Sequence, residues 1–109
     1  MDENDFHMEL TCIVLDETDN VATLLKNVKE GEEVIFTKGN QSHELAVLNS
    51  IQFGHKVAIS HISAGEEVRK YGETIGVSTA FIRPGEHVHI HNVEGIRGRG
   101  DKSEGRKSG

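Results

Sequence analysis

The sequence has 109 residues, which suits one domain with a small core, and no apolar run approaches the roughly 18 residues that a membrane span requires. Only 5% of the residues are aromatic and there is no Trp, so the core must be aliphatic. The acidic N-terminus lacks the basic region of a signal peptide, and the single Cys12 excludes an internal disulfide. Both features are typical of a reducing compartment, and we expect a cytoplasmic protein.

The formal charge of −6 is unevenly distributed along the chain. Residues 97–109 carry five basic and two acidic residues, which leaves seven basic and sixteen acidic residues for 1–96, a net charge of −9. Such an acidic body argues against a nucleic-acid partner, because binding would require neutralisation of phosphates. We therefore divide the chain into a leader (1–10), one domain (11–96) and a flexible, basic, Gly-rich tail (97–109).

The first predicted strand covers residues 11–16, and a short helix is predicted after it. Asp19 or Asn20 would cap this helix, and Gly31 would end it. Its apolar residues recur at helical spacing, namely Val21, Leu24, Leu25 and Val28.

Short strands and glycine turns dominate the rest of the chain. Alternation predicts strands around 34–36 and 45–47, joined by a turn at 38–40, and a further strand at 57–59. A Gly-Glu-x-Val sequence occurs three times, beginning at Gly31, Gly65 and Gly85. Each copy indicates a turn followed by a strand. The predicted fold class is mostly β, with short strands, glycine turns and one short helix.

Three of the seven histidines lie within five residues that follow the Pro84-Gly85 turn. They alternate with apolar residues in the order His87, Val88, His89, Ile90 and His91. Alternation predicts a strand with the three histidines on one face and the two apolar residues on the other. This histidine face is either a metal or substrate site or the polar face of an ordinary sheet.

The spacing limits how these histidines could bind a metal. Neighbours on one face of a strand lie roughly 6.6 Å apart, and the outer two about 13 Å. One His-x-His pair can therefore bind a single ion, whereas binding of one ion by all three histidines of a flat strand would strain the strand. We expect at most two ligands from this strand, with the others from elsewhere, and the third histidine orienting substrate or exchanging protons.

Four motifs, in order, resemble the small N-terminal domain of the altronate dehydratase family. They are Gly54-His55-Lys56-Val57-Ala58, Lys70-Tyr71-Gly72, Ile75-Gly76 and the segment from Gly85 to Asn92, with Asp19-Asn20-Val21-Ala22 matching an earlier segment. The resemblance covers roughly residues 11–93. It implies a SAF domain of the β-clip type, which in that family accompanies a much larger catalytic domain.

The resemblance also implies a cofactor and partners. Activity in the family depends on a divalent metal, usually Fe²⁺, with Mn²⁺ or Zn²⁺ as alternatives. In related lyases such as sulfolactate sulfo-lyase the small domain is a separate subunit, so we expect a large catalytic partner and a sugar-acid substrate. D-galactarate dehydratase shares the Gly-His-Lys segment but not the histidine strand, which makes galactarate a less favoured substrate.

The expected reaction removes a proton beside a carboxylate and a leaving group from the neighbouring carbon. A metal stabilises the developing charge, while Lys and His bind carboxylates or exchange protons. We assign metal binding to His87 and His89. The catalytic candidates are His55, Lys56, Lys70 and Tyr71, and the substrate-binding candidates are His91 and Asn92. The alternatives are the small subunit of sulfolactate sulfo-lyase, or a non-catalytic SAF module that binds a sugar acid or serves assembly.

Overall fold

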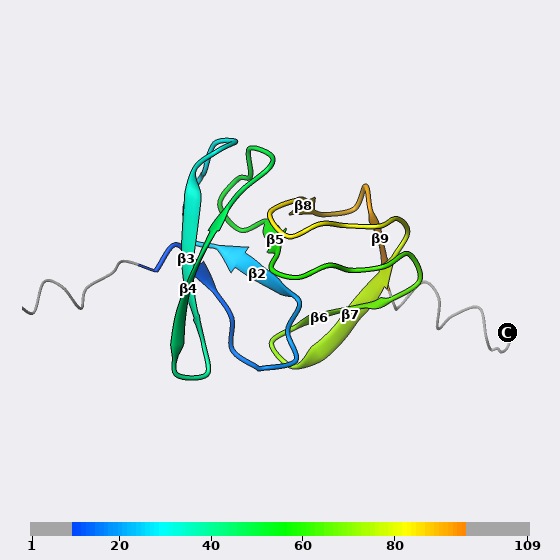
Figure 1. Ribbon diagram of the computed structural model, residues 1–109. Coiled ribbons are helices and arrows are strands. Elements are labelled where there is room, and N and C mark those ends of the chain that lie inside the picture. The colour runs from blue at the N-terminus through cyan, green and yellow to red at the C-terminus, as the bar shows by residue number, and fades with distance from the viewer. Residues whose placement is uncertain (1–9, 96–109) are drawn as a thin grey trace, which may run out of the picture.

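The computed structural model describes residues 10–95, which form nine short strands and no helix (Figure 1). The strands are β1 (Cys12–Ile13), β2 (Val21–Leu24), β3 (Glu33–Lys38), β4 (Gln41–Ala46), β5 (Lys56–Ala58), β6 (Glu67–Lys70), β7 (Glu73–Ser78), β8 (His87–Val88) and β9 (Val93–Gly95). They form antiparallel sheets in the orders β1-β2-β5-β8, β3-β4 and β6-β7-β9. The predicted mostly-β class is confirmed. The predicted leader, apart from Leu10, and the basic tail lie outside the described residues.

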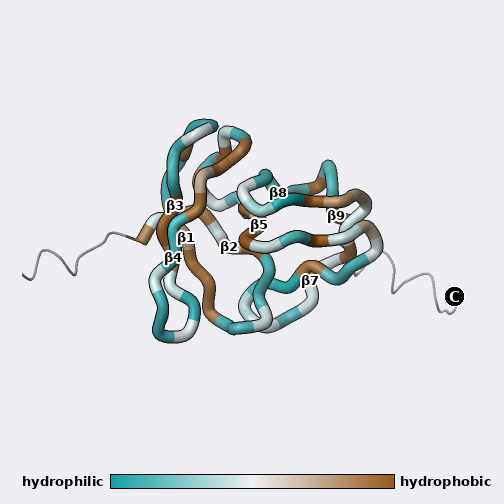
Figure 2. The backbone as a smooth tube through the Cα atoms, in the orientation of Figure 1, coloured by the Kyte–Doolittle hydropathy of each residue, from teal (hydrophilic) through white to brown (hydrophobic). Residues whose placement is uncertain are grey.

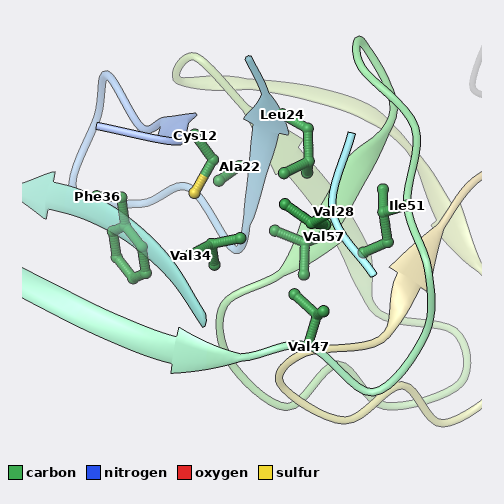
Figure 3. Packing of buried hydrophobic residues seen from close by; sticks show 9 residues of the cluster. All are labelled: Cys12, Ala22, Leu24, Val28, Val34, Phe36, Val47, Ile51 and Val57. Carbon is green, nitrogen blue, oxygen red and sulfur yellow. The ribbon is translucent and has the colours of Figure 1, made fainter. Parts of the chain in front are cut away.

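Two hydrophobic cores lie on opposite faces of the β1-β2-β5-β8 sheet. Successive side chains of a strand point to opposite faces, and accordingly Val57 enters one core while Ala58 enters the other. The first core (Figure 3) contains Cys12, Ala22, Leu24, Val28, Val34, Phe36, Val47, Ile51 and Val57. The second contains Val21, Ala58, Ile62, Val68, Ile82 and Val88. Figure 1 shows the β3–β4 hairpin on one side of β2 and β5, and strands β6, β7 and β9 on the other.

The predicted helix over 20–31 is wrong, because this segment contains the strand β2 followed by a connection that is not helical. Both faces of β2 are buried, so its residues read as an apolar run without the alternation of a half-exposed strand. Val28 forms an isolated bridge with Ile51 instead of a helical turn. An apolar run of this kind matches helical spacing by chance. In Figure 2 the turn that joins β3 to β4 is coloured teal to white, as expected for a hydrophilic turn at the surface.

Four glycine turns of one kind organise the fold. Gly31, Gly54, Gly65 and Gly85 take φ values of 92°, 85°, 88° and 95°, which confirms the turns predicted at 31, 65 and 85 and adds a fourth. The residue after each glycine donates its N–H to the carbonyl three residues earlier, over 2.9–3.0 Å. All four turns therefore share the same backbone frame.

Three of these turns are closed by a glutamate side chain, and the fourth is not. Oε1 of Glu32, Glu66 and Glu86 accepts a hydrogen bond from the backbone N–H three residues earlier, at 2.9, 2.7 and 2.8 Å. In the remaining turn, at Gly54, which we call the fourth turn, His55 takes the position of the glutamate. In the described part of the chain, no side chain takes the glutamate's place on the N–H of Gln52. The imidazole of His55 is therefore free to face β8.

Candidate functional site

Three histidines from two segments of the chain meet beside β5. His55 follows the fourth glycine turn, His87 begins β8, and His89 follows that strand. His55 stacks on His89 with ring centroids 4.1 Å apart and on His87 at 5.1 Å. Nδ1 of His55 lies 2.9 Å from Nε2 of His87, so one of these nitrogens donates to the other. We call these three residues the histidine cluster.

The histidine strand is shorter than predicted, because β8 ends at Val88 and a turn follows. Val88 is fully buried, whereas Ile90 is 83% exposed, so the two do not share a buried face. The turn is held by Asn92, whose Nδ2 donates to the carbonyl of His87 and whose Oδ1 accepts from the N–H of His89, both at 2.9 Å. Both ends of the predicted substrate-binding amide of Asn92 thus support the backbone of the cluster.

His91, the other predicted substrate-binding residue, lies at the rim of the cluster. Its side chain is exposed, and its ring lies 5.1 Å from that of His87 at an angle of 45°. The turn after β8 displaces His91 from the position that a continuous strand would give it. His91 is therefore open to solvent on one side while its ring contacts that of His87 on the other.

Burial and neighbouring positive charge lower the pKa of two histidines of the cluster, His87 and His89. Burial, followed by the charges of His91, His55, His89 and Lys56, lowers the pKa of His87 to about 4. Burial is also the main cause that lowers the pKa of His89. His87 is therefore neutral at pH 7, and a neutral imidazole binds a metal without releasing a proton. Nδ1 of His89 is buried and has no hydrogen-bond partner among the described residues, a state that proteins normally avoid.

Lys56 places positive charge beside the cluster, and Lys70 adds a second positive charge near Lys56. Lys56 is half-buried on β5, and burial, followed by the charge of Lys70, lowers its pKa. Among residues 10–95 no carboxylate forms an ion pair with either lysine. Nζ of Lys70 lies 5.0 Å from the ring centroid of Tyr71. An anionic ligand or partner would find two cations here that no described group neutralises.

Tyr71 occupies the turn between β6 and β7 in a left-handed conformation, with φ at 56°. No ring contact or hydrogen bond joins it to the histidine cluster in the described part of the chain. Of the four predicted catalytic residues, the structure therefore places His55 in the cluster and Lys56 beside it, whereas Lys70 ends β6 and Tyr71 lies in the turn that follows.

Two buried polar residues fix the turn between β6 and β7, and the prediction that Asp19 or Asn20 caps a helix is wrong because the strand β2 follows them. Oδ1 of Asp19 accepts from the N–H of Gly72 at 2.7 Å, and Oδ1 of Asn20 accepts from the N–H of Arg69 at 2.7 Å. Nδ2 of Asn20 also donates to the carbonyl of Glu67 at 2.9 Å. These bonds hold β6 and the turn with Lys70 and Tyr71 against β2. In the sequence, this structural role is indicated by two adjacent polar residues that directly precede an apolar run.

Hollows open to solvent flank the cluster on two sides. One of about 500 Å³ is lined by Asn27, Val28, Ser50, Ile51, Gln52, His55 and His87. A smaller and more apolar one of about 190 Å³ is lined by Lys56, Ile75, His89, Ile90, Val93 and Gly95. Neither encloses a ligand, as most small-molecule sites do. The cluster is thus open to solvent on two sides.

The donor set fits a divalent transition-metal ion. The possible ligand atoms of His55, His87 and His89 all lie within 4.8 Å of one another. Two nitrogens that bind one ion at about 2.1 Å are about 3.4 Å apart in a tetrahedral site, so small ring movements would close the cluster. Imidazole ligands suit iron and zinc. Three nitrogens would leave further positions for substrate or for ligands from another chain.

Comparisons with known proteins agree with this architecture. The family model of the altronate/galactarate dehydratase SAF domain matches residues 10–95. Altronate dehydratase of Escherichia coli is 41% identical over 75 residues, which cover 69% of this chain and 14% of that enzyme. The match to altronate dehydratase of Bacillus subtilis, 32% identical over 82 residues, covers 75% of this chain and 16% of that enzyme.

A further relative is a short protein. (2R)-sulfolactate sulfo-lyase subunit alpha of Chromohalobacter salexigens is 36% identical over 90 residues, which cover 80% of this chain and 96% of that subunit. This chain thus corresponds to about one seventh of an altronate dehydratase and to nearly all of a sulfo-lyase subunit alpha. The chain belongs to the family of altronate/galactarate dehydratase SAF domains.

Proposed function

We propose that this domain is the small component of a lyase that acts on a hydroxy acid, and that its histidine cluster completes an active site with a larger chain. The observation that carries the proposal is the convergence of three possible ligand atoms within 4.8 Å at an open face of the domain. The names of the relatives support the lyase class, since they include both a dehydratase and a sulfo-lyase subunit.

In this proposal His55, His87 and His89 bind one divalent ion, with Fe²⁺ as the first candidate and Mn²⁺ or Zn²⁺ as alternatives. When bound, such an ion acts as a Lewis acid that stabilises negative charge on oxygen. Asn92 keeps the cluster assembled by holding the backbone of His87 and His89. The larger chain would supply the remaining ligands and exclude water.

Lys56 and Lys70 would receive the carboxylate of the substrate. Their charges are unpaired among the described residues, and half-burial of Lys56 strengthens its attraction for an anion. The lowered pKa of Lys56 also brings its amine closer to the range in which a lysine exchanges protons. Tyr71 is held beside Lys70 and would contact the same end of the substrate.

The proposed reaction is the loss of water from a sugar acid such as altronate. Elimination of sulfite from (2R)-sulfolactate is the second candidate, and the 96% coverage of the sulfo-lyase subunit favours it. Both reactions remove a proton beside a carboxylate and expel a group from the next carbon. The same histidines and lysines would serve either reaction, and the leaving group would be selected by the larger chain.

Reconstitution tests this proposal. The domain is mixed with the corresponding large chain and Fe²⁺, and the loss of altronate and of (2R)-sulfolactate is followed separately. We expect turnover of one acid by the mixture and none by the domain alone. His89→Gln should abolish most of the turnover, whereas His61→Gln, at a histidine that stacks on Phe81, should retain it. Turnover by the isolated domain, or full activity of His89→Gln, would contradict the proposal.

A further inference from the structure

Two of the most exposed large hydrophobic side chains flank the histidine cluster. Ile90 directly follows His89 and is 83% exposed, and Phe53 lies two residues before His55 and is 65% exposed. Covering such side chains with a partner recovers free energy in proportion to the apolar area removed from water. Single exposed hydrophobic residues are common on protein surfaces, so their surroundings must decide whether these two form a contact face.

The surroundings of Ile90 extend the apolar surface. Ile90, Ile75 and Val93 together line the hollow of about 190 Å³ that also reaches His89. A partner side chain could enter this hollow while the partner backbone covers Ile90. On the other side of the cluster, the neighbour of Phe53 in the chain, Gln52, lines the hollow of about 500 Å³. Ile90 thus lies at the edge of the cluster, and Phe53 follows directly on a residue that lines the hollow on the other side.

Both side chains project from turns that are fixed by hydrogen bonds. Asn92 holds the turn that carries Ile90 through the backbone of His87 and His89. The N–H of Phe53 donates to Oδ1 of Asn27 at 2.7 Å, which ties the other turn to the segment after β2. A surface that is already ordered loses little conformational entropy when a partner covers it.

The charge of this face differs from that of the rest of the domain. Residues 1–96 carry a net charge of −9, yet Lys56 lies beside the cluster and Lys70 lies near Lys56, and no carboxylate forms an ion pair with either lysine in the described part of the chain. A partner with acidic side chains would neutralise these lysines, and the same class of side chain could complete a metal site.

The relatives indicate the size of such a partner. The aligned segment makes up only 14–16% of the two altronate dehydratases, so in those proteins a region several times larger accompanies this domain. We infer that the face formed by Phe53, Ile90 and the hollow beside Ile90 is the docking surface for the large lyase chain, and that this chain presents acidic side chains to Lys56 and Lys70. The inference rests on the proposed function, because it names the face that the shared site requires.

Matched substitutions at exposed hydrophobic positions test this docking surface. Ile90→Asp and Phe53→Asp introduce a charge on the proposed face, while Leu15→Asp and Phe81→Asp do so at side chains that are 69% and 56% exposed outside it. Calorimetric titration against the purified large chain, defined as the region that follows the SAF domain in altronate dehydratase, measures the affinity of each variant. Binding of Zn²⁺ to each free domain and its Tm verify that the cluster and fold are intact.

The wild-type domain should bind the large chain, and Ile90→Asp should weaken this binding at least about 30-fold, as for a central interface residue. Phe53→Asp should weaken it at least about tenfold, and both controls less than about threefold. Equal binding of the face variants and the wild type would overturn the docking surface, while turnover in the mixture would still uphold the proposed function. An equal loss of affinity in all four variants would also overturn the docking surface, because a general effect of the added negative charge would then explain the loss. Absence of both binding and turnover in the wild-type mixture would overturn the proposed function and the surface together.

Discussion

His55→Gln separates the structural role of position 55 from its chemical role. In three glycine turns a glutamate oxygen closes the turn, and His55 replaces that glutamate in the fourth. A glutamine at position 55 offers a side-chain oxygen at the same distance along the chain, so it can accept from the N–H of Gln52. It also removes the imidazole from the histidine cluster while adding no charge.

The expected change in stability is small because two terms oppose each other. The restored hydrogen bond contributes about 0.5–1.5 kcal/mol. The lost stacking of His55 on His89 and His87 costs about 0.5–1.5 kcal/mol beyond the area buried. The free energy of unfolding should therefore change by less than about 1 kcal/mol, and the Tm by less than about 8 °C.

The expected change in metal affinity is much larger. Loss of a group that merely supports a ligand lowers affinity about 10- to 100-fold, and loss of a ligand should cost at least as much. Competition with a chromophoric chelator measures Zn²⁺ affinity, and circular dichroism measures the Tm. His61→Gln, which removes a stacked ring away from the cluster, serves as the control. The reasoning would be refuted by unchanged Zn²⁺ affinity in His55→Gln, or by a Tm loss above about 10 °C, which would indicate a packing role.

Three further predictions concern the frame of the cluster. The pKa of His87 is about 4 in the folded protein and near 6.5 in the unfolded chain, so the unfolded state binds more protons between these two pH values. The Tm should therefore fall as the pH drops from 6.5 to 4. His87→Gln should reduce this dependence of the Tm on pH. Asn92→Ala leaves two backbone groups of the cluster without partners and should lower the free energy of unfolding by about 2–3 kcal/mol. Zn²⁺ binding should weaken as well, although no candidate ligand changes, and unchanged Zn²⁺ binding would contradict the supporting role of Asn92. Gly85→Ala would place a Cβ 2.5 Å from a backbone oxygen, so its Tm should fall further than that of Gly31→Ala, where only the positive φ costs about 1–2 kcal/mol.

Local patterns predicted much of the fold. Alternation located β3, and the apolar run at 57–59 overlaps most of β5, whereas the strand expected around 45–47 overlaps only the end of β4. The Gly-Glu-x-Val echo located three turns, because it depends on interactions within a few residues. The pattern extends to Gly54-His55-Lys56-Val57 if the second residue is allowed to vary, and this fourth member was missed. Written in that form, the repeat would have indicated His55 as the one departure from a structural glutamate.

Two features could not be derived from such patterns. The burial of β2 on both faces depends on hairpins that pack against it from distant parts of the chain. The end of β8 at Val88 depends on the side chain of Asn92, which competes with the strand ladder for the backbone of His89. Alternation continues in the sequence through His91 although the strand does not. The nearness of His87 to His89 follows from their spacing, whereas the approach of His55 requires the pairing of β5 with β8.

The replacement of glutamate by histidine in the fourth turn also determines the charge of the candidate site. A carboxylate at position 55 would close its own turn and lie near Lys56, where it would neutralise one of the two unpaired lysines. With His55 the turn lacks a side-chain closure worth about 1 kcal/mol, but no carboxylate is added beside Lys56 and an imidazole joins the other two histidines. The positive charge of Lys56 then stays available to the anionic substrate and the acidic partner that we propose, and a glutamate at position 55 would weaken both interactions.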